Sequence, residues 1–130
     1  MLDASGQNPL AEKVRLIGIA APDWKQQKPW SLEAQQQLEA LIGTDRTVRL
    51  EFDVQPQVTY NETTLRLAYV WKGNDLLNER LVEEGYVLAS SRSPNLKYEQ
   101  RLTYAQEKAR LLGVGIWNSE HPLRQDPEEL

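Results

Sequence analysis

Two central segments alternate apolar and polar residues, and this pattern constrains the fold more than any other feature of the chain. In residues 47–54, Val48, Leu50, Phe52 and Val54 share one face, and charged residues occupy most of the other. Residues 65–71 repeat the alternation, with Leu65, Leu67, Tyr69 and Trp71 on one face. Because successive side chains of a strand point to opposite sides, both segments are predicted to be strands with one apolar face.

Three helices are predicted around these strands. The strongest pattern covers roughly residues 97–112, where apolar residues recur at the 4-3-4-3 spacing of one helix face: Tyr98, Leu102, Ala105, Ala109 and Leu112. A second helix is capped by Ser31 and ends at Gly43. A shorter third helix opens at Asn78 and ends at Gly85. Glycine after a helix readily adopts the left-handed backbone that ends it.

The remaining segments complete the predicted domain. Residues 14–19 and 86–89 are predicted to be short strands, whereas residues 24–29 and 55–63 are polar and are predicted to be loops. These elements indicate an α+β domain over residues 1–117, a mixed barrel or sheet with three helices. Residues 118–130 are polar and acidic, which is typical of a loose tail.

Composition excludes several kinds of site and gives little information on compartment. The chain has 130 residues, no cysteine and one histidine, His121, so it has no disulfide, thiolate metal site or histidine-based zinc site. Neither a transmembrane segment nor a signal peptide is visible, and localisation stays unassigned. The net charge of −4 argues against strong nucleic-acid binding, although a local basic patch is compatible with an acidic average.

Four segments in order resemble the thermonuclease family, the staphylococcal-nuclease-like domains. They are VRLIGIAAPDW at 14–24, LAYVW at 67–71, LLNERLVEEGYV at 76–87 and AQEKARLLGVGIW at 105–117. The family fold is a five-stranded OB-type barrel with three helices, so the resemblance implies an OB-fold here. It also implies that the first strand and most of the second are missing from this chain.

The resemblance implies phosphodiester hydrolysis, in which a glutamate acts on water, two arginines stabilise the phosphate and two aspartates hold calcium. Arg15 matches the first arginine. The glutamate falls on Asp23, whose side chain is one methylene shorter, and one calcium aspartate falls on Ala20. The other aspartate would lie at or before Met1. We therefore expect no bound cofactor and weak or absent calcium binding.

The second catalytic arginine of the family falls on Leu65. Arg66 is adjacent and is a candidate replacement, but it could serve only if a bulge shifts the register of the strand. The tyrosines that pack nucleotide in some family members fall near Ser90 and Arg92. A nucleic-acid surface with aromatic and cationic side chains is expected beside this site. Its candidate residues are Trp24, Lys25, Lys28, Leu67 and Arg92.

The scaffold residues match the family, whereas the chemical residues mostly do not. This pattern predicts a thermonuclease-like domain with weak or no nuclease activity, and it leaves open whether the chain is an enzyme. The alternatives are a non-catalytic nucleic-acid-binding module and a protein-interaction module. Single-stranded DNA or RNA is the expected partner, and open barrel edges also predict a homodimer. Any nuclease activity is expected to be lost in Arg15→Ala and Asp23→Ala.

Overall fold

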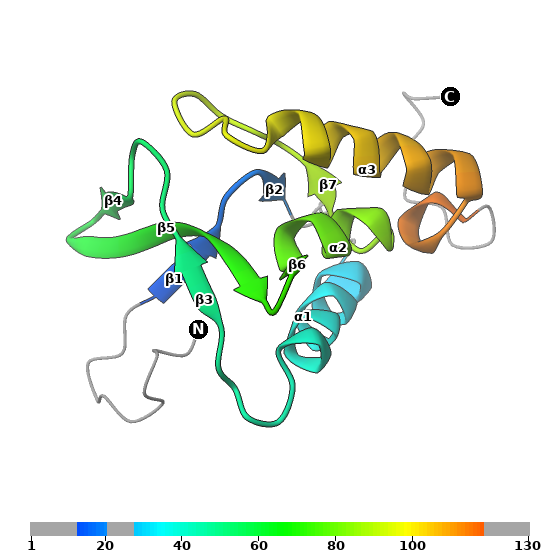
Figure 1. Ribbon diagram of the computed structural model, residues 1–130, viewed down its shortest axis with the longest axis horizontal. Helices are drawn as coiled ribbons and strands as arrows, with labels where there is room; N and C mark the ends of the chain where they lie inside the picture. Colours follow the sequence, from blue (N-terminus) through cyan, green and yellow to red (C-terminus); the bar gives the residue numbers. More distant parts are fainter. Residues whose placement is uncertain (1–12, 21–27, 119–130) are drawn as a thin grey trace.

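Strand β5 (Thr63–Lys72) is the spine of the main sheet in the computed structural model, which describes residues 13–20 and 28–118, the first four of the latter by their backbone alone. The first half of β5 pairs in parallel with β1 (Lys13–Leu16) and antiparallel with β4 (Gln57–Tyr60). Its second half pairs antiparallel with two further strands, β3 and β6. One strand therefore holds all the others of this sheet in register (Figure 1).

The remaining strands are short, and two of them form a separate pair. Strand β3 covers Arg49–Glu51, and β6 covers Asp75–Leu76 directly before a helix. Strands β2 (Ile19–Ala20) and β7 (Leu88–Ala89) form a separate antiparallel pair. Strand β2 follows β1 after a turn at residues 17 and 18, so this second pair lies next to the end of β1. The loop after β7 therefore begins there as well.

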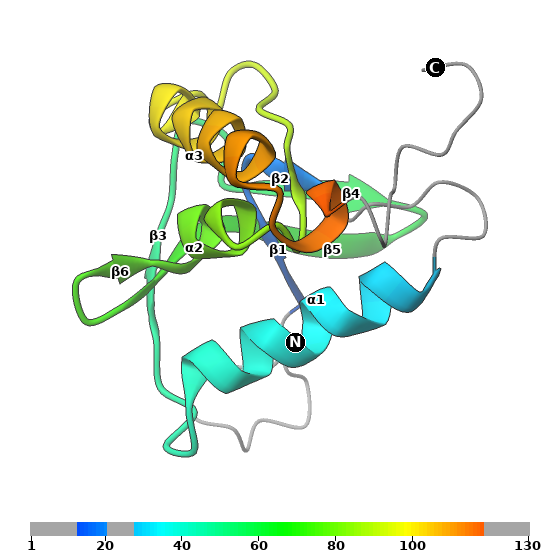
Figure 2. The same ribbon diagram turned by 90° about the vertical axis from the view of Figure 1, so that its right-hand side faces the viewer.

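Three helices pack against one another beside the sheet. Helix α2 (Leu77–Glu83) lies between α1 (Lys28–Ile42) and α3 (Glu99–Leu112), as Figures 1 and 2 show. A short 3₁₀ turn, η1 (Gly115–Trp117), follows α3. The helices share an apolar core whose buried members are Ala34, Leu81, Val82, Val87, Leu102 and Ala105. None of the described helices has the length and apolar character of a membrane span.

Asn78 is a buried polar residue that joins the helices to the sheet. Its side chain is fully buried, and its Oδ1 accepts a hydrogen bond from the backbone N–H of Val70 at 2.9 Å. Its Nδ2 donates to the backbone carbonyl of Ile17 at 2.8 Å. Buried polar groups require such partners, so one side chain fixes α2 against both β5 and the end of β1.

The α+β class, the three helices and the mixed OB-like sheet confirm the predicted fold class. The loop predicted for residues 55–63 is wrong, because Gln57–Tyr60 forms β4. The predicted strand 14–19 is interrupted at Gly18, whose φ of +82° turns the chain between β1 and β2. Helix α1 begins at Lys28, three residues before the predicted cap.

The apolar face predicted for residues 47–54 is only partly buried. In the predicted strand 47–54 only Arg49–Glu51 pairs with β5, and Phe52 and Val54 are 37% and 73% exposed. At the end of the domain Ile116 is fully buried, whereas Trp117 is only half-buried. The prediction that the first strand is missing concerns residues outside those that the structure describes. The same holds for nearly all of the predicted tail at 118–130.

Candidate functional site

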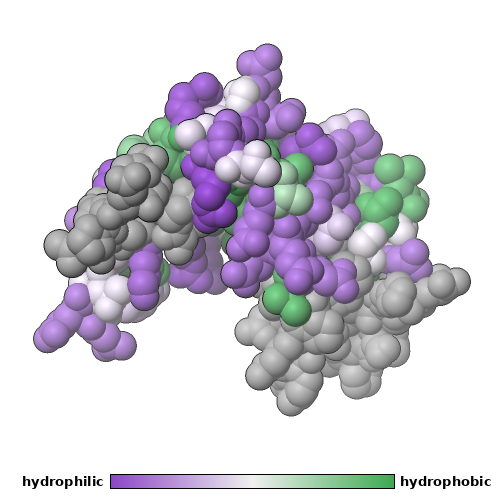
Figure 3. Space-filling model, turned by 90° about the horizontal axis from the view of Figure 1, so that it is seen from below, coloured by the Kyte–Doolittle hydropathy of each residue, from purple (hydrophilic) through white to green (hydrophobic). Residues whose placement is uncertain are grey.

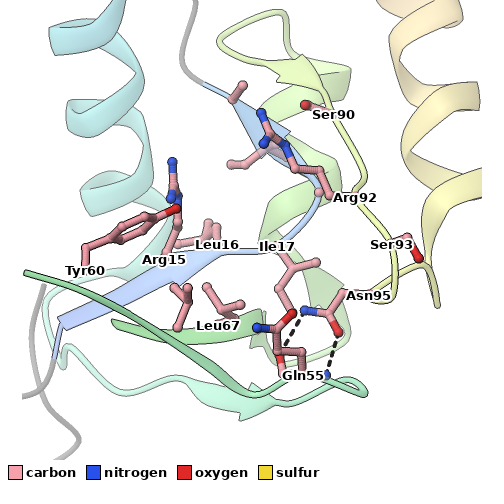
Figure 4. Close-up of a pocket in the computed structure, with 14 residues that line it drawn as sticks. Arg15, Leu16, Ile17, Gln55, Tyr60, Leu67, Ser90, Arg92, Ser93 and Asn95 are labelled. Carbon is pink, nitrogen blue, oxygen red and sulfur yellow. Dashed lines mark hydrogen bonds between the residues drawn. The ribbon is translucent and has the colours of Figure 1, made fainter. Parts of the chain in front are cut away.

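A pocket of about 270 Å³ opens where β1, β4 and the loop after β7 meet. We call it the β1 pocket. Figure 4 shows its lining residues, which come from segments far apart in the sequence. Its lining includes Arg15, Ala20, Gln55, Tyr60, Leu67 and Arg92.

Strand β1 positions Arg15 at this pocket. Arg15 lies opposite Leu67 in the parallel pairing of β1 with β5, and both residues line the pocket. The next residue, Leu16, packs against the core on the other side of the strand, as the alternation of side chains requires. Within the described residues, the exposed Arg15 side chain has no ion pair or hydrogen bond. None of these residues therefore competes with an anion for its guanidinium group.

A second arginine reaches the same pocket from the loop after β7. The loop is tied to the turn after β1 by a hydrogen bond from Ser90 N–H to the carbonyl of Gly18 at 2.7 Å. At its other end Asn95, only 5% exposed, accepts from Gln55 N–H at 2.8 Å and donates to the Gln55 carbonyl at 2.9 Å. These bonds hold the backbone that carries Arg92, which lines the pocket.

Tyr60 supplies an aromatic wall. It is the last residue of β4, it lines the pocket and it is 56% exposed. In Figure 4 its ring lies beside the Arg15 side chain, and Arg15 and Arg92 extend to the same side of β1. An exposed ring next to cationic groups is the arrangement on which proteins stack single-stranded bases.

The described lining of the pocket is cationic. It includes two arginines, and no aspartate, glutamate or histidine is among the lining residues that the structure describes. Ala20, at the end of β2, brings only a methyl group to the rim. Calcium prefers six to eight oxygen ligands that include carboxylates. The described residues therefore suit an anion and do not fit a calcium ion.

A second polar network, outside the pocket lining, fixes the segment that precedes α3. Glu51 accepts hydrogen bonds from Trp71 Nε1 at 2.9 Å and from Tyr98 Oη at 2.8 Å, and it pairs with Lys97 Nζ. Burial opposes ionisation of Glu51, but these donors outweigh burial and lower the pKa of its carboxyl group. Negative charge at Glu51 is thus part of the folded state.

Asp53 continues this network two residues further along. It accepts from Tyr69 Oη at 2.7 Å and from Lys97 N–H at 3.0 Å. Burial is again outweighed by these hydrogen bonds, and the pKa of Asp53 is lowered. Burial together with the bond to Asp53 raises the pKa of the Tyr69 phenol. The charged face predicted for residues 47–54 therefore serves as an anchor for Lys97 and Tyr98.

Comparison with known proteins shows the family of this chain. The family model for staphylococcal nuclease homologues matches residues 13–119. The chain belongs to the staphylococcal nuclease homologue family. It is 35% identical over 112 residues to a thermonuclease of Staphylococcus hyicus, covering 83% of this chain and 64% of that protein. It is 34% identical over 121 residues to a thermonuclease of Staphylococcus intermedius, covering 90% of this chain and 68% of the other.

These relatives confirm the predicted resemblance and place this staphylococcal nuclease homologue in a family of nucleases. The matched part spans about two-thirds of each relative's length.

The structure brings together some of the predicted site residues of this staphylococcal nuclease homologue and separates others. Arg15, Ala20, Leu67 and Arg92 line one pocket. Arg66 is not among the lining residues; its guanidinium carbon lies 4.5 Å from the centre of the Phe52 ring.

The other predicted residues are not placed by the structure. Asp23, Trp24 and Lys25 lie outside the described residues, and the side chain of Lys28, the first residue of α1, is not described. Their predicted roles stay predictions.

Sequence reasoning did not identify Tyr60, Gln55 or Asn95 as part of the site. All three line the β1 pocket. Tyr60 and Gln55 lie in the segment predicted to be a loop, and a strand signal there would have required knowledge of the pairing with β5. Asn95 follows a proline in a polar loop, a context that indicates a turn and not a buried anchor.

Proposed function

We propose that this staphylococcal nuclease homologue binds single-stranded DNA or RNA by holding a phosphate at Arg15, and that it hydrolyses the strand weakly or not at all. The supporting observation is the Arg15 guanidinium, which lines the β1 pocket without an ion-pair partner among the described residues. Guanidinium groups bind phosphate oxygens through two parallel N–H donors. Membership of a nuclease family supports a nucleic acid as the source of that phosphate.

The proposal of weak hydrolysis rests on two positions. Ala20 has no metal-binding group where the resemblance implies a calcium aspartate, and Leu65 has no charge where it implies an arginine. Removing a single group that stabilises charge in a transition state commonly costs about a hundredfold to a thousandfold in rate. Asp23 could still act on water, but its shorter side chain places the carboxylate differently, and about 1 Å of misplacement can cost a hundredfold.

A binding experiment tests the phosphate contact. Fluorescence anisotropy with a labelled oligothymidylate would be recorded over a salt series for the native chain, Arg15→Gln and Lys13→Gln. Lys13 is the matched control, because it is an exposed cation on the same strand and is absent from the pocket lining. We expect Arg15→Gln to weaken binding and to reduce the slope of log affinity against log salt by about 0.7, the share of one phosphate on a single strand. Equal effects of both variants would refute a specific contact at Arg15.

A cleavage experiment tests the remaining chemistry. Single-stranded DNA and RNA would be incubated with high protein concentrations, with calcium and with a chelator. We expect little or no cleavage in either condition. Rapid calcium-dependent cleavage that disappears in Arg15→Ala would show that the site is competent and that the weak-activity proposal is wrong.

A protein-interaction module is the second candidate. Three exposed apolar residues on α3 favour it, with Tyr104, Leu111 and Leu112 being 72%, 86% and 64% exposed. On the face seen in Figure 3, by contrast, hydrophobic residues form only small separate patches. Light scattering over a concentration series tests self-association. A stable dimer that is lost in Leu111→Ser would favour this candidate, and a monomer at all concentrations would count against the predicted homodimer.

A further inference from the structure

Arg92 is the second guanidinium group of the β1 pocket. The strand position that would carry a second arginine in the family holds Leu65, and the adjacent Arg66 lies against Phe52, outside the pocket lining. Arg92 comes from a different part of the chain, the loop after β7, yet it lines the same pocket as Arg15. Figure 4 shows the two side chains extending to the same side of β1.

The backbone that carries Arg92 is fixed. Its carbonyl accepts a hydrogen bond from Asn95 N–H at 2.9 Å, and the buried Asn95 side chain makes two hydrogen bonds with the backbone of Gln55. Ser90 N–H is bound to Gly18 on the other side of Arg92. An arginine held at both ends of its loop loses less freedom when it binds a ligand than one on a mobile loop, which favours affinity.

Among the described residues, no carboxylate balances the positive charge of the two guanidinium groups. Neither Arg15 nor Arg92 has an ion pair with any residue that the structure describes, and the described lining has no carboxylate. The other guanidinium groups of the helical region are paired: Arg80 with Glu84, Arg101 with Glu79, and Arg110 with Glu107. Two cations at one pocket that have no ion pair with the described residues repel each other, and a bound anion relieves that repulsion.

The chemistry of the phosphate group decides which anion fits best. An internal phosphodiester carries one negative charge and two non-bridging oxygens. A phosphate monoester carries a charge of about −1.5 to −2 near pH 7 and has three acceptor oxygens. Two arginine forks can each engage a pair of oxygens on a group with three, whereas they must compete for two on a diester.

We propose that the β1 pocket prefers a phosphate monoester, the phosphorylated end of a nucleic-acid strand, over an internal phosphodiester, and that Arg92 confers this preference. The proposal rests on the proposed function, because it takes the contact between Arg15 and phosphate as given. Arg15 holds either kind of phosphate. Arg92 adds a second fork and a second charge, which only the monoester uses fully.

Competition binding tests this preference. A labelled oligothymidylate of about eight nucleotides would be displaced at low salt by unlabelled strands of the same length with a 5′-phosphate, a 3′-phosphate or neither. We expect a phosphorylated strand to bind about five- to tenfold more tightly than the unphosphorylated one, the effect of about one added charge next to two cations in a solvated site. The two phosphorylated strands distinguish which end is accepted.

Variants assign the preference to a residue. Arg92→Gln is expected to bring the ratio of the two affinities close to one, and Arg92→Lys, which keeps the charge but not the fork, to retain part of it. Arg66→Gln removes the same charge outside the pocket lining and is expected to leave the ratio unchanged. Thermal melts of all variants check that each is folded.

The outcomes separate the two proposals. Equal affinities for phosphorylated and unphosphorylated strands, with binding still dependent on Arg15, would overturn the preference and leave the proposed function intact. A preference that survives in Arg92→Gln, or disappears in Arg66→Gln, would overturn the assignment to Arg92. Binding that depends on neither Arg15 nor Arg92 would overturn the proposed function itself.

Discussion

Replacing Asn78 by alanine is expected to destabilise the fold strongly. The substitution leaves the backbone N–H of Val70 and the carbonyl of Ile17 buried without their partners, which lie at 2.9 and 2.8 Å in the native chain. Each unsatisfied buried group costs about 1–3 kcal/mol. The lost packing of a fully buried side chain adds to this cost. We expect the free energy of unfolding to fall by about 3–5 kcal/mol, a large part of the roughly 5–15 kcal/mol typical of a domain.

Urea unfolding followed by tryptophan fluorescence measures this loss. Gln36→Ala, an exposed change on α1, is the control and is expected to stay within about 0.5 kcal/mol of the native chain. A loss below about 1 kcal/mol in Asn78→Ala would refute the reasoning, because it would mean that water or backbone movement satisfies both groups.

Asn78→Asp distinguishes hydrogen bonding from packing. The aspartate has the same shape as Asn78, but one of its carboxylate oxygens faces the Ile17 carbonyl oxygen. Because this repulsion and burial disfavour the charged form, folding raises the pKa of the new carboxyl group. A raised folded-state pKa means that the folded chain binds the proton more tightly, so the destabilisation relative to the native chain should shrink as the pH falls from 7 to 4. A penalty that is independent of pH would indicate packing alone.

The remaining predictions concern the aromatic wall, one helix end and acid stability. Tyr60→Ala is expected to weaken binding of single-stranded DNA by about 1–3 kcal/mol in anisotropy titrations, and Tyr60→Phe to restore it; equal losses would argue against stacking. Gly85→Ala is expected to lower the free energy of unfolding by more than Gly73→Ala. Both glycines have positive φ, but only at Gly85 would a Cβ meet a backbone oxygen, at 2.4 Å. The pKa values of Glu51 and Asp53 are lowered by folding, so the unfolded chain binds more protons in acid. The free energy of unfolding should therefore fall as the pH drops from about 5 to 3, and less steeply in Glu51→Gln.

The longest periodic patterns predicted their elements well. The stripe along residues 97–112 became α3, where Leu102, Ala105 and Ala109 are buried but Leu112 is exposed. The alternation at 65–71 became β5, which buries Tyr69 on the predicted face and also Ala68 and Val70 on the other. Strand β4 has no such face. Of its four residues only Val58 is half-buried, and its conformation depends on pairing with β5 and not on its own side chains. The alternation at 47–54 also continued past the last residue of β3 that pairs with β5.

The sequence predicted only those site residues that lie in a recognisable strand or match a position of the family. The match of Arg15 to a strand motif located it, and Leu67 followed from the neighbouring strand. Arg92 was placed near the site by the resemblance to the family, but its place in the same pocket as Arg15 involves the contact between Asn95 and Gln55, which are 40 residues apart. A contact over that separation leaves no local pattern in the sequence. Tyr60 was missed because its strand was missed.

The groups that shape the β1 pocket are different residues from those that would perform hydrolysis there. Gln55 and Asn95 hold one end of the loop of Arg92, and the bond from Ser90 to Gly18 holds the other. None of these contacts needs a carboxylate at Ala20 or a charge at position 65, so the pocket can form without them. An aspartate at the rim would also repel a phosphate unless a cation lay between them. With alanine there, a phosphate meets two guanidinium groups and no opposing carboxylate among the described lining residues.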